Sequence, residues 1–181
     1  MTPLEITLSL LVGLLLLAVG FYAWHARKPG LHRKLKMISP EYTRHLVIPD
    51  GLDGHIELDY LLLTPHGLVV MDYREIHGTI FAGANLDLWT VLQDHNRFSI
   101  QNPFNTMRHR LNAVRGLVKD VPVIGLVVFP DVARFGNTPP ENVIHESELL
   151  ERFSPGIVSN QELLTKAFHQ QYKILSATVG S

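Results

Sequence analysis

An apolar run near the N-terminus constrains this chain more than any other feature. Leu4 to Trp24 covers 21 positions, and its strongly polar residues, Glu5, Thr7 and Ser9, all lie at its beginning. A helix of this length, rising 1.5 Å per residue, measures about 31 Å, close to the roughly 30 Å hydrocarbon core of a bilayer. We therefore predict a transmembrane helix over residues 4–24, which makes the lipid bilayer the first expected partner. Residues 1–3 form its outer end.

Basic residues follow this run and predict its orientation. Segment 25–40 contains His25, Arg27, Lys28, His32, Arg33, Lys34 and Lys36. Positive charge next to a membrane helix usually stays in the cytoplasm, so we predict a basic juxtamembrane linker there and an N-terminus outside. A cleaved signal peptide is the alternative. It fits worse, because no Lys or Arg precedes the apolar run and the run is too long.

The remaining chain has the size of one domain, which we place at residues 41–175, with a frayed tail over 176–181. The net charge of −1 excludes nucleic-acid affinity that comes from bulk charge alone. The absence of cysteine excludes disulfides, thiolate zinc sites and cysteine nucleophiles.

Short apolar runs and turn signals indicate an α/β (α+β) domain. Residues 55–64 and 68–74 are β-rich and separated by a short Pro/Gly turn, which predicts a hairpin. Further strands are expected at 43–48 (or a helix end), 78–82, 89–92, 121–129 and 143–144, and helices at 104–119, 147–153 and 159–174. Strands 78–82 and 89–92 would continue the hairpin as a meander. We predict one central mixed sheet flanked by helices.

The helix at 104–119 has clear signals. Asn102 is a good N-cap, Pro103 suits the first helical position, and apolar residues recur at steps of three and four. Arg108, Arg115 and Lys119 would form a basic stripe beside the apolar face, with Arg110 on the opposite flank. These side chains are candidates for contacts with DNA or RNA phosphates. A solvated shoulder of a core helix is the alternative.

The hairpin carries the residues that suggest chemistry. Strand faces repeat every two residues, so Glu57 and Asp59 share one face, as do Asp72 and Arg74. An even turn places Asp59 opposite Asp72 and Glu57 opposite Arg74. An odd turn sends Asp72 to the other face. In the even register two adjacent carboxylates would suit Mg²⁺ or Mn²⁺. An ion pair of Arg74 with Asp72 or Glu57 at a sheet edge is the alternative.

Several short motifs resemble the nuclease-related domain (NERD) family. They are Glu57-Leu-Asp59-Tyr60, Gly67 to Arg74 (GLVVMDYR), Gly78-Thr-Ile80, Trp89 and Asn102-Pro103. The resemblance covers about residues 45–119 and implies a restriction-endonuclease-like fold. By it, Asp59 and Asp72 are the metal ligands and Arg74 stands where the family has Lys. Asp72 replaces the usual Glu, and Thr106 a frequent Gln.

Together with the predicted membrane helix, this resemblance implies a membrane-anchored nuclease. We expect a single-pass protein of the bacterial inner membrane, with its domain in the cytoplasm, that hydrolyses nucleic-acid phosphodiesters with Mg²⁺. Asp59 and Asp72 would hold the metal, Glu57 would act as an auxiliary acid, and Arg74 would stabilise the leaving charge. The alternative is an inactive module that binds nucleic acid or protein, because Arg is forked and never deprotonated and so does not replace Lys conservatively.

Overall fold

The computed structural model describes residues 12–21, 29–153 and 161–177, in two compact units, Met1–Lys34 and Leu35–Ser181. Residues 12–21 are helical, and all ten are exposed. The rest of the predicted span 4–24 lies outside the described residues, as do residues 1–3. In the described ranges, no helix combines the length and hydropathy that a membrane crossing requires.

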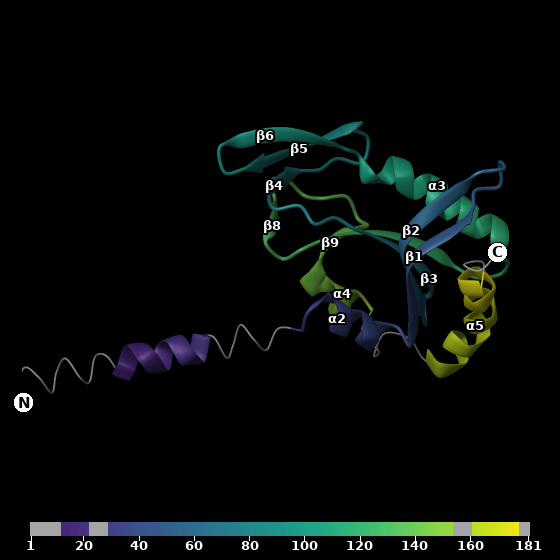
Figure 1. Ribbon diagram of the computed structural model, residues 1–181, viewed down its shortest axis with the longest axis horizontal. Helices are drawn as coiled ribbons and strands as arrows, with labels where there is room; N and C mark the ends of the chain where they lie inside the picture. The colour runs from purple at the N-terminus through teal and green to yellow at the C-terminus, as the bar shows by residue number, and fades with distance from the viewer. Residues whose placement is uncertain (1–11, 22–28, 154–160, 178–181) are drawn as a thin grey trace, which may run out of the picture. The chain divides into compact units, whose positions relative to one another are not determined.

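The larger unit is built on a five-stranded sheet with the order β1-β2-β3-β7-β9 (Figure 1). Strands β1, β2 and β3 pair antiparallel, whereas β3, β7 and β9 run parallel. The bounds are β1 Glu41–Pro49, β2 His55–Thr64, β3 Gly67–Tyr73, β7 Val123–Phe129 and β9 Val143–His145. The predicted α/β class, the mixed character of the sheet and the hairpin are confirmed.

A second sheet corrects the predicted single sheet. Its order is β6-β5-β4-β8, with bounds β4 Gly78–Phe81, β5 Leu88–Gln93, β6 Asn96–Gln101 and β8 Ala133–Phe135. Strand β4 cannot extend the meander because β3 already has both neighbours: β2 pairs with one edge and β7 with the other. Strand β6 is not among the predicted strands; its residues are nearly all exposed, and its apolar alternation is limited to Phe98 and Ile100.

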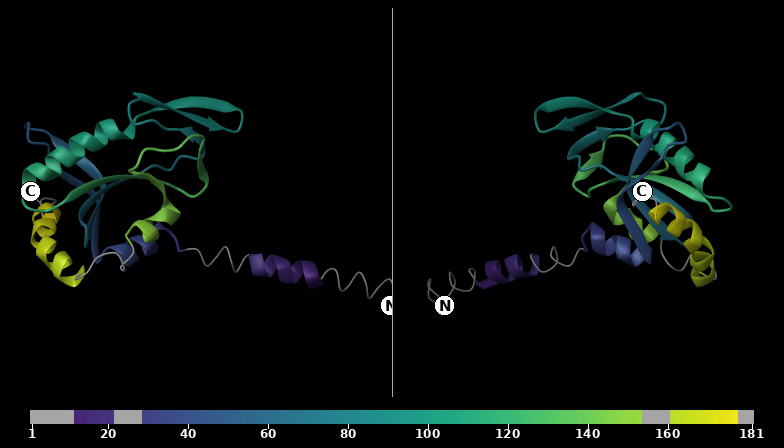
Figure 2. Two further views of the ribbon diagram at one scale, coloured as in Figure 1. Left: turned by 180° about the vertical axis from the view of Figure 1, so that it is seen from behind. Right: turned by 45° about the vertical axis from the view of Figure 1, so that its right-hand side comes forward.

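Helices cover both faces of the five-stranded sheet. Helices α3 (Pro103–Leu117) and α5 (Gln161–Ala177) lie on one side (Figure 1). The end of α2 (Leu31–Ile38) and the segment η1–α4 (Glu146–Glu148 and Leu149–Arg152) lie on the other, as the reverse view in Figure 2 also shows. Side chains on both faces of β3 are buried, for example Val70 and Met71. This explains why its apolar run does not alternate.

Helix α3 begins as predicted. Asn102 is its N-cap and accepts a hydrogen bond from the Phe104 amide at 2.9 Å, and Pro103 occupies the first helical position. The helix ends at Leu117 rather than at residue 119, because Val118 adopts an extended backbone. Helix α5 runs through Ala177, so its ordered part extends into the predicted tail. Position 159, its predicted cap, lies outside the described residues.

Candidate functional site

The hairpin register brings the two predicted acids together. Leu63 lies opposite Leu68 and Tyr60 opposite Met71, so the next positions, Asp59 and Asp72, face each other on the same side of the sheet. This is the even register; the odd register is wrong. The same face of β7 carries Gly125, where an added Cβ would meet Met107 and Leu111 of α3. The two carboxylates therefore lie beneath α3.

Asp72 is the most buried member of the site. It is 1% exposed, and its Oδ2 accepts hydrogen bonds from Arg74 Nη2 at 2.6 Å and Nε at 3.0 Å. Burial and the neighbouring Asp59 carboxyl raise the pKa of Asp72 to about 6, although the Arg74 guanidinium opposes this rise. The Asp59 carboxyl therefore makes ionisation of Asp72 less favourable, and a cation shared by the two carboxylates would relieve this repulsion.

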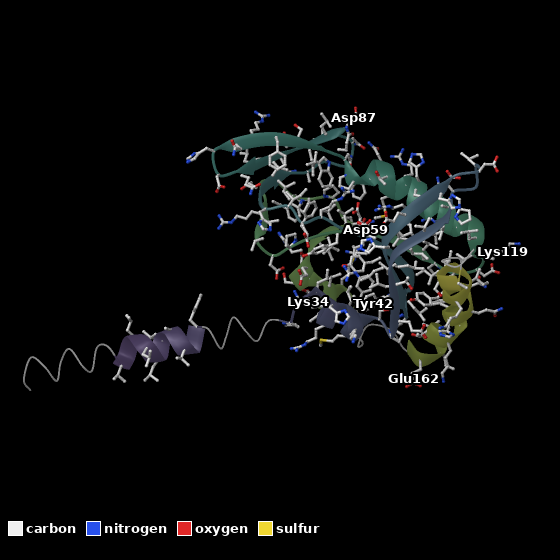
Figure 3. All side chains as sticks on the ribbon, viewed as in Figure 1. Lys34, Tyr42, Asp59, Asp87, Lys119 and Glu162 are labelled. Atoms are coloured by element: carbon white, nitrogen blue, oxygen red, sulfur yellow. The ribbon has the colours of Figure 1, made fainter. Side chains whose placement is uncertain are left out.

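Arg110 of α3 reaches both acids. Its Nη2 donates to Asp59 Oδ1 at 2.9 Å, and its Nη1 lies 3.5 Å from Asp72 Oδ2. The residue is 9% exposed, and its buried Nε and Nη1 make no hydrogen bond within the described part of the chain. In the view of Figure 3 Asp59 lies near the middle of the larger unit, whereas Asp87 and Lys119 lie near its edge. The charges at the site are thus two carboxylates and two guanidiniums.

Sequence reasoning missed this role of Arg110, which it predicts on the flank of the helix opposite the basic stripe, as a candidate phosphate contact. A signal was present: position 110 follows Met107 by three and precedes Val114 by four, and all three residues are buried. A lone arginine at a core-facing helical position requires an acidic partner on the opposing sheet, because a buried charge without a partner is costly.

Glu57 lies apart from the acid pair. Its side chain is exposed, and its Oε1 lies 2.8 Å from Nδ1 of His45, a residue of β1 with φ of 49°. The expected pairing of Glu57 with Arg74 is absent from the described contacts. The pairing of β2 with β3 ends at Tyr60 and Met71, and the Arg74 guanidinium turns to Asp72 instead, at 2.6 Å.

The predicted basic stripe is present only in part. Arg108 and Arg115 are exposed on α3, and Arg115 Nη2 also donates to the Val123 carbonyl at 3.1 Å. Lys119 is exposed but lies beyond the end of the helix, so helical spacing does not align it with the two arginines. Arg110 is buried in the acid pair.

The acid pair could supply only two protein ligands to a metal ion. Within the described ranges, three or more His, Cys, Asp or Glu side chains nowhere gather closely enough to hold an ion. Two carboxylates still fit Mg²⁺, which is commonly bound by one or two carboxylates together with waters and substrate phosphates. The chemistry of Asp59 and Asp72 therefore fits this ion, and Arg110 bridges the same two groups.

These features define an α/β domain with two mixed sheets and an acidic pair on adjacent central strands. The family model of the nuclease-related domain, NERD, matches residues 31–130, and the chain belongs to this family. The match includes Asp59, Asp72, Arg74 and Arg110. Searches of curated proteins and of solved structures found no match.

Proposed function

We propose that this protein is a metal-dependent nuclease, a phosphodiester hydrolase that acts on DNA or RNA and has a restriction-endonuclease-like core. One observation carries the proposal: Asp59 and Asp72 flank the paired positions Tyr60 and Met71 on adjacent strands, and their carboxyl groups are neighbours beneath one helix. Membership of the nuclease-related family supports it. The substrate class follows from that family, and the catalytic part of the proposal concerns the acid pair together with Arg74 beside it.

In this proposal Asp59 and Asp72 are the ligands of Mg²⁺, with Mn²⁺ as a substitute. A bound ion would activate a water molecule and offset the charge that develops on the phosphate. Asp72 is held in place by Arg74, whose side chain is 37% exposed and so can also meet a phosphate that approaches from solvent. Glu57 is given no direct part, because its carboxylate lies against His45.

Phosphate contacts outside the acid pair would come from exposed cations. Arg108 and Arg115 of α3 and Lys119 after it are the candidates, because they are exposed and lie on, or directly after, the helix that covers the site. Such contacts position a nucleic acid without reading its sequence. Arg110 is excluded from this group by its burial.

The membrane remains part of the proposal. We infer that residues 4–24 cross the bacterial inner membrane and leave the domain in the cytoplasm. The described part of this segment, residues 12–21, supports the inference, since Leu14, Leu15, Leu16, Leu17 and Phe21 are all at least 64% exposed. An apolar helical surface of this kind is costly in water and is stable in a lipid environment.

The second candidate is an inactive module of the same fold that binds nucleic acid or a protein partner. The guanidiniums at the acid pair favour it, because Arg74 and Arg110 together balance the charge of Asp59 and Asp72. The position of Arg74, where the family has Lys, favours it as well.

A cleavage assay separates the two candidates. The full-length chain, purified in detergent, is incubated with labelled single- and double-stranded DNA and with RNA, with Mg²⁺, with Mn²⁺ or with EDTA. The nuclease reading predicts cleavage that EDTA abolishes and that Asp72→Asn reduces at least about a hundredfold, the usual cost of losing a group that acts in the transition state. If wild type and Asp72→Asn bind nucleic acid equally strongly and neither cleaves it, the result supports the inactive module.

A further inference from the structure

Arg110 lies between the two carboxylates that we propose as the ligands of a divalent ion. Its Nη2 lies 2.9 Å from Asp59 Oδ1 and its Nη1 lies 3.5 Å from Asp72 Oδ2, so one guanidinium spans both groups. Helix α3 holds it there, since Met107 and Val114 anchor the same face of the helix in the core.

The contacts of this guanidinium are incomplete. Its Nε and Nη1 are buried without a hydrogen-bond partner among the described residues, and the 3.5 Å approach to Asp72 is an ion pair without hydrogen-bond geometry. A buried N–H group without an acceptor is unfavourable. The Arg110 guanidinium therefore balances the charge of the two acids but leaves two of its own N–H groups without acceptors. Moving it away from the acids would break few hydrogen bonds.

The positive charge of Arg110 opposes the entry of a metal ion between the two acids. Asp59 and Asp72 carry two negative charges, and Arg74 and Arg110 carry two positive charges. A divalent ion that enters this neutral group meets a guanidinium at contact distance, in a buried setting where like charges repel strongly. Without Arg110 the remaining three groups carry one net negative charge and attract the ion.

We propose that Arg110 is a resident counter-ion that competes with divalent metal for the Asp59–Asp72 pair and so limits metal affinity. The proposal rests on the proposed metal-dependent function, because it concerns the same two carboxylates. Metal entry then requires the guanidinium to withdraw from at least one acid. Arg110 is in this sense a regulating residue rather than a metal ligand.

Binding measurements test the proposal independently of cleavage. Mn²⁺ serves as the probe, its binding to the full-length chain is followed by electron paramagnetic resonance, and Arg110→Gln is compared with wild type. Arg110→Gln should bind Mn²⁺ roughly tenfold or more tightly, because a full positive charge has left the site. Arg134→Gln, which removes an exposed arginine of β8, should bind as wild type does. Asp59→Asn added to Arg110→Gln should abolish the gain.

A second readout covers the case in which Arg110→Gln folds poorly. Mn²⁺ should raise the urea midpoint of Arg110→Gln more than that of wild type even if the variant is less stable, because a ligand that binds only the folded state stabilises it. Arg110→Lys keeps the positive charge, so Mn²⁺ should shift its midpoint about as little as that of wild type. Equal Mn²⁺ affinity in wild type and Arg110→Gln overturns the proposal, as does the absence of binding in both. Tighter binding by Arg110→Gln without cleavage by any variant supports the proposal and rejects the nuclease.

Discussion

Arg74 donates two hydrogen bonds to the same oxygen of Asp72, from Nη2 at 2.6 Å and from Nε at 3.0 Å. The two residues are only two positions apart at the end of β3, so a local contact fixes the orientation of a buried acid. Asp59 and Arg110, by contrast, lie 51 positions apart and meet only through the packing of α3 on the sheet. The site thus combines one local ion pair, Arg74 with Asp72, and two long-range ion pairs of Arg110, with Asp59 and with Asp72.

The buried acid predicts a pH dependence of stability. The pKa of Asp72 in the folded state is about 6, above the value of about 3.9 expected in the unfolded chain. The folded state therefore binds this proton more tightly. The resulting contribution to stability is fully present below about pH 4 and is lost as the pH rises through about 6, a change of about 3 kcal/mol.

Urea unfolding between about pH 4 and pH 7 measures this contribution as a difference between wild type and Asp72→Asn, which carries no titrating group. The unfolding free energy of wild type relative to that of Asp72→Asn should fall as the pH rises across this range. In Asp59→Asn the change should move to lower pH, because the neighbouring acid no longer raises the pKa of Asp72. Parallel curves for wild type and Asp72→Asn would contradict the prediction.

Arg74→Lys restores the residue type that the family resemblance places at this position. Lysine presents a compact charge, so it makes fewer simultaneous contacts with Asp72 and approaches a phosphate more freely. We expect Mg²⁺-dependent cleavage to rise by about tenfold or more, within the range of contributions from a positioned catalytic group. The initial rate on labelled DNA measures the effect, and Arg134→Lys serves as the matched control. No gain for Arg74→Lys favours the inactive module.

Asn102 connects the second sheet to α3. Its side chain caps the helix at the Phe104 amide, and its Nδ2 donates to the carbonyls of Ala84 and Leu86 at 3.1 Å and 2.7 Å. Asn102→Ala should lower the unfolding free energy by about 2–3 kcal/mol, from the lost cap and the carbonyls left without a donor. Asn102→Asp keeps the cap acceptor but sets a carboxylate against those carbonyls, so it should destabilise at least as much. A near-native urea midpoint for Asn102→Asp would show that the donor contacts are unimportant.

Two glycines should respond in opposite ways to alanine. Gly67, at the β2–β3 turn, has φ of 120°, and an added Cβ would overlap the Pro122 carbonyl oxygen. Gly67→Ala should therefore cost more than about 1–2 kcal/mol, since both the backbone conformation and the close approach oppose it. Gly116 lies on α3 with open space around its Cβ position, so Gly116→Ala should stabilise by about 0.5–1 kcal/mol. Thermal unfolding of the two variants checks both signs.

Charges in the middle of the apolar run test the proposed membrane anchor. Leu14→Arg combined with Leu15→Arg should release the chain from the membrane fraction, because each arginine at the centre of a membrane helix costs about 2.5–3.5 kcal/mol. Leu52→Arg, in an exposed turn of the domain, is the control and should leave the distribution unchanged. Retention after a carbonate wash measures the effect. Equal release of wild type and the double variant would argue against an anchor.

Local patterns in the sequence predicted much of this protein. The apolar runs marked β2, β3 and β7, and Asn102 with Pro103 marked the start of α3, because periodicity and capping depend on residues close in the chain. The candidate acids followed from the two-residue repeat of the strands, which left two hairpin registers open. Family resemblance predicted Asp59, Asp72 and Arg74 as the candidate site.

Only the tertiary structure decided the arrangement around these acids. It selected the even register, moved β4 and β5 into a second sheet because β7 occupies the free edge of β3, and paired Glu57 with His45. It also placed Arg110 between Asp59 and Asp72. These outcomes depend on which strand pairs with which edge and on how α3 packs against the sheet. Such contacts join residues far apart in the chain, and local patterns do not encode them.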